Sequence, residues 1–138
     1  AEWQEFVNCL TTNLTAFFRE SHHFDALADE LRRRAHHRWR IWCSAASTGE
    51  EPYSIAIVAA EVLGAGRASV LWSLGEPFAA VFCRNVMIYF DSPTQRRVLE
   101  AMHRTLAPGG LLFVGHSENF NDARELFRLR GKTIYERV

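Results

Sequence analysis

The sequence lacks the signals that define several broad classes of protein. No stretch approaches the roughly 20 consecutive apolar residues that span a bilayer, and the first ten residues, AEWQEFVNCL, lack the basic start and apolar core of a signal peptide. Neither sign of charge is in excess, because 16 basic side chains balance 16 acidic ones and the formal net charge is zero. No overall electric field therefore favours nucleic acid or an anionic membrane. We expect a cytoplasmic protein with no nucleic-acid partner and no membrane insertion.

Cysteine is scarce, and its spacing shows no paired pattern. Cys9, Cys43 and Cys83 are odd in number, far apart and without a CxxC pair, which argues against a disulfide framework and against a zinc site. Cys43 and Cys83 fall in apolar segments with the composition of strands, so we expect buried thiols there. Histidine occurs in two doublets, His22–His23 and His36–His37. Adjacent side chains on a helix diverge by about 100°, so the sequence predicts no metal site.

The phosphate-cradling motifs GxGxxG and GxxxxGK[ST] are absent as well, yet one segment has the general form of a nucleotide-type ligand site. An apolar strand predicted over Trp39–Ser44 runs into a turn and then into a helix that ends near Gly64. Ala45, Ala46 and Gly49 in the turn have too little side chain to block a ligand that approaches the backbone. The pattern predicts a nucleoside-like ligand without a pyrophosphate.

The acidic residue after this turn has a second interpretation. Thr48 followed three residues later by Glu51 forms a capping-box pattern, and Pro52 suits a first helical turn. Glu51 is therefore either a ligand contact or a residue that closes the start of a helix.

A basic run from Arg32 to Arg40 is the one local concentration of charge. Asp29 and Glu30 precede it, which favours a solvated helix face, and the alternative is a docking surface for an acidic partner.

Hydrophobic periodicity predicts alternating helices and strands in one domain of ordinary size. The expected helices cover Trp3–Leu10, Phe24–Ala35, the segment after Gly49, and Ser92 to just before Pro108. The expected strands cover Trp39–Ser44, Ala68–Trp72, the apolar run that starts at Ala79, Leu111–Gly115, and a terminal hairpin around Arg130–Lys132. This order predicts an α/β, Rossmann-like fold with a parallel sheet and a C-terminal antiparallel hairpin.

Four blocks of sequence together resemble one known family. They are LTTNLTAFFRE from Leu10, SAASTGEEPYSIAI from Ser44, FCRNVMIYFD from Phe82 and LFVGHSENF from Leu112. In this order they closely resemble the CheR-type chemotaxis receptor methyltransferases. The resemblance implies a Rossmann-like methyltransferase fold that uses S-adenosyl-L-methionine and yields S-adenosyl-L-homocysteine. It also implies methyl transfer to glutamate side chains, with the cytoplasmic domain of a chemoreceptor as the protein substrate.

The resemblance also implies site residues, each at a position that matches the family's blocks. The implied cofactor contacts are Asn13, Thr15, Arg19, Glu51, Arg84 and Asn85. Two residues are implied to take part in catalysis: Arg19, which would orient the substrate carboxylate, and Tyr89, which lies near the transferred methyl group in the family. Local capping by Asn13 and Thr15, core packing by Tyr89 and a surface ion pair at Arg19 are the alternatives.

The chain departs from the family's pattern in two places. Residues 1–12 correspond to a remnant of the family's N-terminal helical region, and residues 13–138 to the methyltransferase domain with an internal deletion near 73–75. At the position where the family has an acidic residue for the cofactor ribose, this chain has Leu74, and Glu76 is the nearest carboxylate. A non-catalytic module that binds a receptor or other partner, or an inactive fragment, is the alternative function.

Overall fold

The computed structural model describes residues 15–36, 38–64, 68–70 and 77–138. The predictions for the helix at Trp3–Leu10, for Asn13, and for Leu74 and Glu76 lie outside these residues. The α-helices are α2 (His22–Arg33), α3 (Glu50–Leu63) and α4 (Ser92–Thr105). The strands are β1 (Trp39–Cys43), β2 (Ala68–Val70), β3 (Phe78–Cys83), β4 (Leu106–Val114), β5 (Phe127–Gly131) and β6 (Ile134–Arg137). Two short 3-10 helices, η1 (Met87–Tyr89) and η2 (Asn121–Ala123), complete the described elements.

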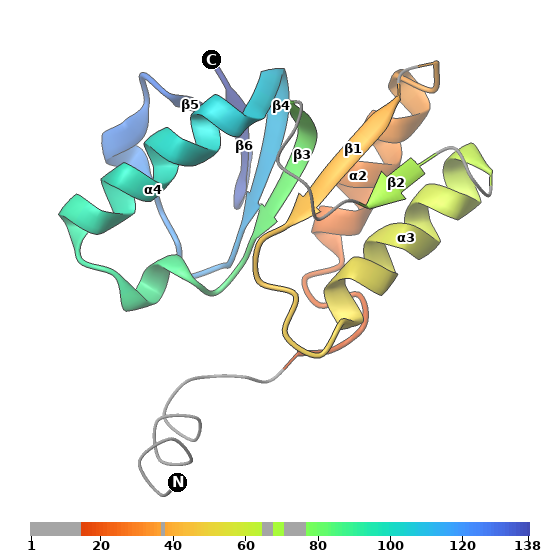
Figure 1. The fold of residues 1–138 in the computed structure, drawn as a ribbon, viewed down its shortest axis with the longest axis horizontal. Helices are drawn as coiled ribbons and strands as arrows, with labels where there is room; N and C mark the ends of the chain where they lie inside the picture. The colour runs from red at the N-terminus through yellow and green to blue at the C-terminus, as the bar shows by residue number, and fades with distance from the viewer. Residues whose placement is uncertain (1–14, 37, 65–67, 71–76) are drawn as a thin grey trace, which may run out of the picture.

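The strands form one mixed sheet in the order β2-β1-β3-β4-β6-β5 (Figure 1). The first four strands in that order pair in parallel, and β6 and β5 continue the sheet in antiparallel pairing. Helix α3 connects β1 to β2, and η1 and α4 lie between β3 and β4, as the alternation in the sequence predicted. The α/β, Rossmann-like fold with a C-terminal antiparallel hairpin is thus confirmed.

Helices cover both faces of the sheet, so its central strands are buried on both sides. Helices α2 and α3 pack on one face, where they share a hydrophobic cluster with Phe82 and Phe113, while α4 packs on the other face with Val81 and Leu112. Figure 1 shows α4 on the opposite side of the sheet from α2 and α3. Successive residues of a strand point to opposite faces, which is why strands β3 and β4 are apolar at almost every position.

One predicted boundary was wrong. The prediction placed a helix stop at Pro108–Gly110, but helix α4 ends at Thr105 and strand β4 begins at once with Leu106. The register of β3 against β4 shifts between Phe78 and Ala80, so the extra residues are absorbed inside the strand pair. A side chain at Gly110 would lie 2.8 Å from a backbone carbonyl oxygen, which explains why glycine fits this irregular stretch.

The basic run is divided between two environments. At the end of α2, Arg32 pairs with Asp29 at 3.0 Å, and the C-cap residue Arg34 pairs with Glu30 at 2.8 Å, which favours the solvated helix face over a docking surface. Arg40 on β1 is instead buried, with its guanidinium 4.9 Å from the centre of the Phe78 ring.

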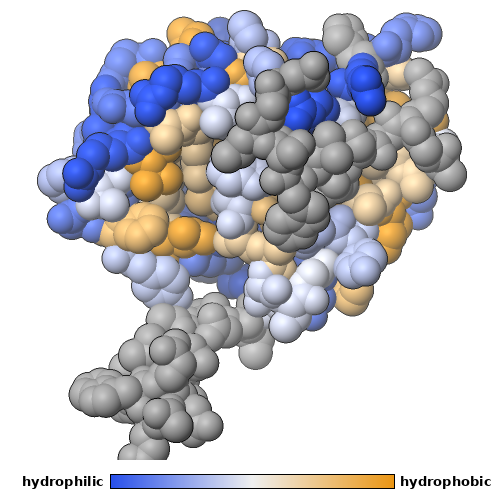
Figure 2. Space-filling model, viewed as in Figure 1, coloured by the Kyte–Doolittle hydropathy of each residue, from blue (hydrophilic) through white to orange (hydrophobic). Residues whose placement is uncertain are grey.

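The surface seen from the same side mixes hydrophilic and hydrophobic side chains. On this face, hydrophobic residues among those described lie in small groups between hydrophilic ones (Figure 2). Among the described residues, no helix combines the length and the apolar character needed to cross a membrane.

Candidate functional site

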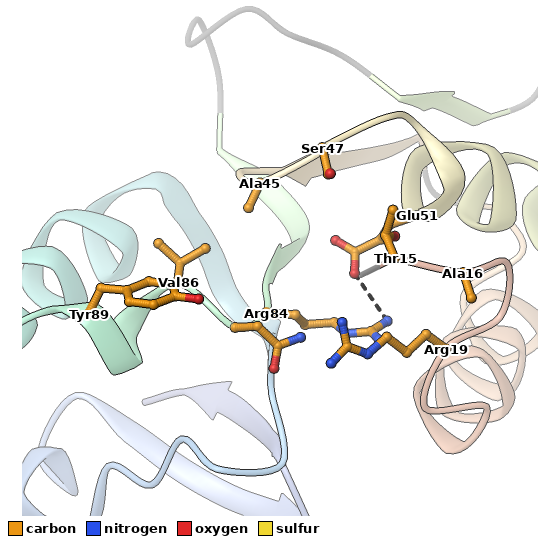
Figure 3. Close-up of a pocket in the computed structure, with 10 residues that line it drawn as sticks. Thr15, Ala16, Arg19, Ala45, Ser47, Glu51, Arg84, Val86 and Tyr89 are labelled. Atoms are coloured by element: carbon orange, nitrogen blue, oxygen red, sulfur yellow. Dashed lines mark ion pairs between the residues drawn. The ribbon is translucent and has the colours of Figure 1, made fainter. Parts of the chain in front are cut away.

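A cavity of about 320 Å³ opens at the carboxyl ends of β1 and β3 (Figure 3). Three segments form it: the chain before α2, the turn between β1 and α3, and the loop between β3 and η1. The lining residues are Thr15, Ala16, Arg19, Ala45, Ser47, Glu51, Arg84, Asn85, Val86 and Tyr89. Its size is within the range of small-molecule sites, and its place at the ends of parallel strands is where α/β sheets bind ligands.

The turn before α3 does not form the capping box that the sequence allowed. The N-cap position is Gly49, with φ of 109°, and no side chain caps the helix there. The hydroxyl of Thr48 donates to Glu50 at 2.6 Å, so Thr48 is not engaged with Glu51. Because a left-handed backbone favours glycine, this turn starts the helix without a side-chain cap and leaves the Glu51 carboxylate to face the cavity.

Glu51 and Arg84 form a buried ion pair in the cavity wall. Arg84 Nη1 lies 3.1 Å from Glu51 Oε2, and the two side chains are only 3% and 11% exposed. Burial raises the pKa of Glu51, while a hydrogen bond from Cys43 and the charge of Arg84 act in the opposite direction. In the part of the chain that the structure describes, Arg84 Nε has no hydrogen-bond partner although it is buried. This wall therefore combines a carboxylate with a guanidinium that has one donor unused.

Arg19 reaches the same wall from the segment before α2. Two neighbours of Arg19, Phe18 and Glu20, have φ near +55° (54° and 56°), which bulky residues rarely adopt, and the Phe18 N–H donates to Ser54 Oγ on α3 at 3.0 Å. This hydrogen bond ties the bent segment to α3. In Figure 3 the guanidinium of Arg19 points toward Glu51 and Arg84, and its charge lowers the pKa of Glu51. Thr15 lies in the same segment, six residues before the N-cap residue of α2, so it does not cap that helix.

Tyr89 borders the cavity from the side opposite to Arg19 in Figure 3. It belongs to η1 and is 50% exposed, so the alternative of core packing is wrong. Asn85 and Val86 lie between β3 and η1 and also line the cavity. Six of the seven residues expected at the site, all except the undescribed Asn13, thus border one cavity.

The role of Cys43 in this wall was not predicted from the sequence. Cys43 is buried, as expected, but its thiol also donates to Glu51 Oε1 at 2.9 Å. Burial raises the pKa of the thiol, and the neighbouring Glu51 carboxylate adds to that shift. One feature of the sequence could have indicated this contact: Cys43 is the last residue of β1, directly before the turn that lines the cavity.

The histidine doublet on α2 also behaves differently from the prediction. His22 and His23 do not diverge: the Nε2 atoms of both approach the Thr133 hydroxyl, at 3.3 Å and 2.7 Å. With Glu20 they bring possible metal-ligand atoms within 4.8 Å of one another. The shared hydrogen bonds to Thr133 account for this grouping, and they join the start of α2 to the terminal hairpin.

His23 is fully buried within that group. Its ring contacts Phe113 edge to face, with 5.4 Å between ring centres, and Nδ1 lies 3.6 Å from Glu20 Oε2. Burial lowers the pKa of His23 from 6.5 to about 3, and the charges of Arg84 and His22 add to the shift. His23 is therefore neutral at physiological pH.

The cavity residues suit the cofactor that the sequence predicted. The amino-acid end of S-adenosyl-L-methionine carries one positive and one negative group, and the cavity offers the carboxylate of Glu51 beside the guanidinium groups of Arg19 and Arg84. The hydroxyls of Thr15 and Ser47 add neutral hydrogen-bonding groups.

Comparison with known proteins agrees with this chemistry. The family description "CheR methyltransferase, SAM binding domain" matches residues 13–72 and 68–135. The chain is 40% identical to a chemotaxis protein methyltransferase of Klebsiella aerogenes, over 98% of this chain and 70% of that protein. It is 42% identical to chemotaxis protein methyltransferase 2 of Pseudomonas aeruginosa, over 97% and 73% respectively. Among solved structures, a putative methyltransferase of Escherichia coli, yhhF, matches with a TM-score of 0.47 and 16% identity over 85% of each chain.

The alignments with the two chemotaxis protein methyltransferases are longer than the chain itself. The alignment with the Klebsiella aerogenes protein extends over 203 residues, which exceeds the 138 residues of this chain by 65. Within the aligned region, some residues of the relative are therefore aligned with gaps in this chain. The matches to the family description nevertheless include most of the chain, and the chain belongs to the CheR methyltransferase family.

Proposed function

We propose that this chain transfers a methyl group from S-adenosyl-L-methionine to glutamate side chains of chemoreceptors. The observation that carries the proposal is the convergence of Thr15, Arg19, Glu51, Arg84 and Tyr89 on one cavity, although they come from three separate segments. Membership of the CheR methyltransferase family and the names of its relatives support the choice of cofactor and reaction.

The proposed reaction does not require general acid–base catalysis by the protein. S-adenosyl-L-methionine supplies a methyl group on a positively charged sulfur. A glutamate carboxylate is already ionised near pH 7, so the protein does not need a base to activate it. The side chains of the cavity need only bind, orient and exclude water, and correct placement of two reactants supplies up to about 7 to 11 kcal/mol of a barrier.

Each side of the cavity has a distinct role in this proposal. Glu51, Arg84 and Arg19, with Asn85 and Thr15, hold the cofactor. Arg19 orients the carboxylate of the substrate, because a guanidinium pairs with a carboxylate through two parallel hydrogen bonds. Tyr89 shapes the opposite side of the methyl-transfer site, as its place in Figure 3 suggests.

The protein substrate in this proposal is the cytoplasmic domain of a chemoreceptor, which places the reaction in the cytoplasm. Support comes from Tyr89, which lines the cavity, and from Ile88 and Phe90 on either side of it in the chain, because all three large hydrophobic side chains are exposed. Exposed apolar side chains at the mouth of a site suit contact with a protein segment.

We also infer that the chain lacks an internal segment that its relatives have near residues 73–75. Two observations support this inference: the two matches to the family description overlap at residues 68–72, and the alignment with the Klebsiella aerogenes protein is longer than this chain. A non-catalytic receptor-binding module is the second candidate function, because the missing segment includes the region expected to hold the cofactor ribose.

Titration calorimetry with S-adenosyl-L-homocysteine tests the first part of the proposal. We expect saturable binding by the unsubstituted chain and weaker binding by Glu51→Gln. Arg97→Ala, which removes an exposed arginine on α4, is the control and leaves binding unchanged. Absence of binding by folded protein, checked by circular dichroism, overturns the proposed cofactor site.

Methyl transfer to a receptor cytoplasmic fragment tests the second part. Radioactive methyl from labelled cofactor is measured in the fragment for the unsubstituted chain, Arg19→Ala and Tyr89→Phe. We expect incorporation that falls in both variants but not in Arg97→Ala. Cofactor binding and receptor pull-down without incorporation would instead establish the non-catalytic module.

A further inference from the structure

We propose that Glu118 is a positioning residue of this cavity, and that its carboxylate holds the loop between β3 and η1 in the conformation that lines it. The inference rests on the cofactor site proposed above. Glu118 lies after β4, is 4% exposed and is not among the residues that line the cavity. It therefore acts on the cavity through the loop and not by touching a ligand.

Four backbone N–H groups donate to this one carboxylate. Oε1 accepts from Val86 at 2.9 Å and from Met87 at 2.6 Å, while Oε2 accepts from Asn85 at 3.1 Å and from Gly115 at 2.6 Å. A carboxylate offers about four lone-pair sites, and each oxygen of Glu118 receives two donors. Hydrogen bonds to a charged acceptor are stronger than neutral ones, so Glu118 joins the loop after β3 firmly to the loop after β4.

The loop needs this support because its backbone is unusual. Asn85 has φ of 58°, in the left-handed region, which few residues other than glycine adopt and which asparagine adopts more readily than most. The opposite loop approaches so closely that a side-chain carbon at Gly115 would lie 3.0 Å from the Asn85 nitrogen. The Asn85 N–H is thereby enclosed between the two loops, and Glu118 provides its acceptor.

The held segment is one of the three segments that line the cavity. It begins next to Arg84, whose guanidinium pairs with Glu51, and it leads into η1 and Tyr89. At the other end of the segment, the side-chain amide of Gln95 donates to the Met87 carbonyl at 2.9 Å and to the Phe90 carbonyl at 3.1 Å. Glu118 thus accepts from the N–H groups of the segment, while Gln95 donates to its carbonyl groups. Without the Glu118 carboxylate, the N–H groups of residues 85–87 lose their acceptor.

The test uses Glu118→Gln, which keeps the shape of the side chain but replaces one acceptor oxygen with an NH₂ group. That group faces backbone donors, so two of the four hydrogen bonds are lost. We expect the dissociation constant for S-adenosyl-L-homocysteine to rise about tenfold or more, which corresponds to about 1.4 kcal/mol. Hydrogen exchange should accelerate at the amides of residues 85–87 and 115, while the amides of β3 and β4 keep their protection. Glu100→Gln, on the surface of α4, is the matched control and changes neither measurement.

The outcomes separate this inference from the proposed function. Failure of the unsubstituted chain to bind S-adenosyl-L-homocysteine would overturn both the proposed cofactor site and the effect on affinity. Exchange at residues 85–87 and 115 would still decide whether Glu118 orders the loop. Unchanged affinity in a Glu118→Gln protein, when the unsubstituted chain binds, overturns the positioning role alone. If Glu118→Gln does not fold, exchange in the unsubstituted chain decides: rapid exchange at these four amides contradicts the inference, and slow exchange supports it.

Discussion

Protonation of His23 should destabilise the folded chain in mildly acidic solution. The folded pKa is about 3, below the ordinary value of 6.5, because the ring is buried between Phe113 and Thr133 and close to the charge of Arg84. Between these two pKa values the unfolded chain binds a proton that the folded chain does not bind. The free energy of unfolding therefore rises as the pH rises through this range, and the contribution levels off above pH 6.5.

The size of the effect follows from the two pKa values. Near pH 5 the unfolded chain is almost fully protonated at His23, and each pH unit below 6.5 contributes up to about 1.4 kcal/mol. Acidification from about pH 8 to about pH 5 should therefore remove roughly 2 kcal/mol of the free energy of unfolding. We expect His23→Gln, whose side chain does not titrate, to lack this pH-dependent contribution to the free energy of unfolding.

Urea unfolding followed by circular dichroism, at several pH values, measures the difference. The unsubstituted chain and His36→Gln, which removes an exposed histidine, should show the same pH dependence. His23→Gln should be less stable at neutral pH but lose less stability on acidification, by about 2 kcal/mol. Parallel pH profiles for His23→Gln and the unsubstituted chain would refute the reasoning, because they would mean that His23 is not held neutral by burial.

Three further predictions concern other contacts. Glu51→Gln removes the negative charge that balances a buried guanidinium, so it should lower the free energy of unfolding by about 3 kcal/mol or more in urea titrations; a loss below about 1 kcal/mol would show that Arg84 does not need a charged partner. Burial raises the pKa of Cys83 to about 12 and also raises the pKa of Cys43. In a Cys9→Ser protein we therefore expect no thiol to react with a disulfide reagent at about pH 8 until urea unfolds the chain. Rapid reaction of the native protein would contradict this prediction. Asp91→Ala removes the carboxylate that accepts the Thr94 N–H at the start of α4 at 2.9 Å, which should cost about 1 kcal/mol in the same urea assay; Asp91→Asn, whose amide oxygen still caps the helix, should lose less, and equal losses would argue against capping.

The sequence predicted the sheet well because its signals are local. Continuous apolar runs at β3 and β4 reflect burial on both faces of a parallel sheet, and the glycine that ends β5, with the lysine after it, marks a hairpin. The helix stop at Pro108 failed for the opposite reason. Whether a proline and two glycines end a helix or lie within an irregular strand depends on pairing with β3, which only the tertiary structure decides.

The sequence predicted which residues line the site, but it did not predict the hydrogen bonds that hold the site together. Family resemblance located Thr15, Arg19 and Glu51, and the cavity brings them together. The acceptor role of Glu118 depends on four backbone N–H groups, which every residue except proline carries, so the identities of these residues do not reveal the contact. Likewise, the shared contact of His22 and His23 with Thr133 joins positions more than 100 residues apart, so no local pattern could predict it.

The cavity spans the ends of β1 and β3, which pair only after the chain has closed a long crossover through α3 and β2. No single helix, strand or hairpin carries enough of the site to bind a ligand by itself. A ligand at this site would therefore bind the folded chain and not its unfolded form, and at one hundred times its dissociation constant it would add about 2.7 kcal/mol to the free energy of unfolding. In the cell, the concentration of cofactor would thus help to set how much of this short chain is folded at any moment.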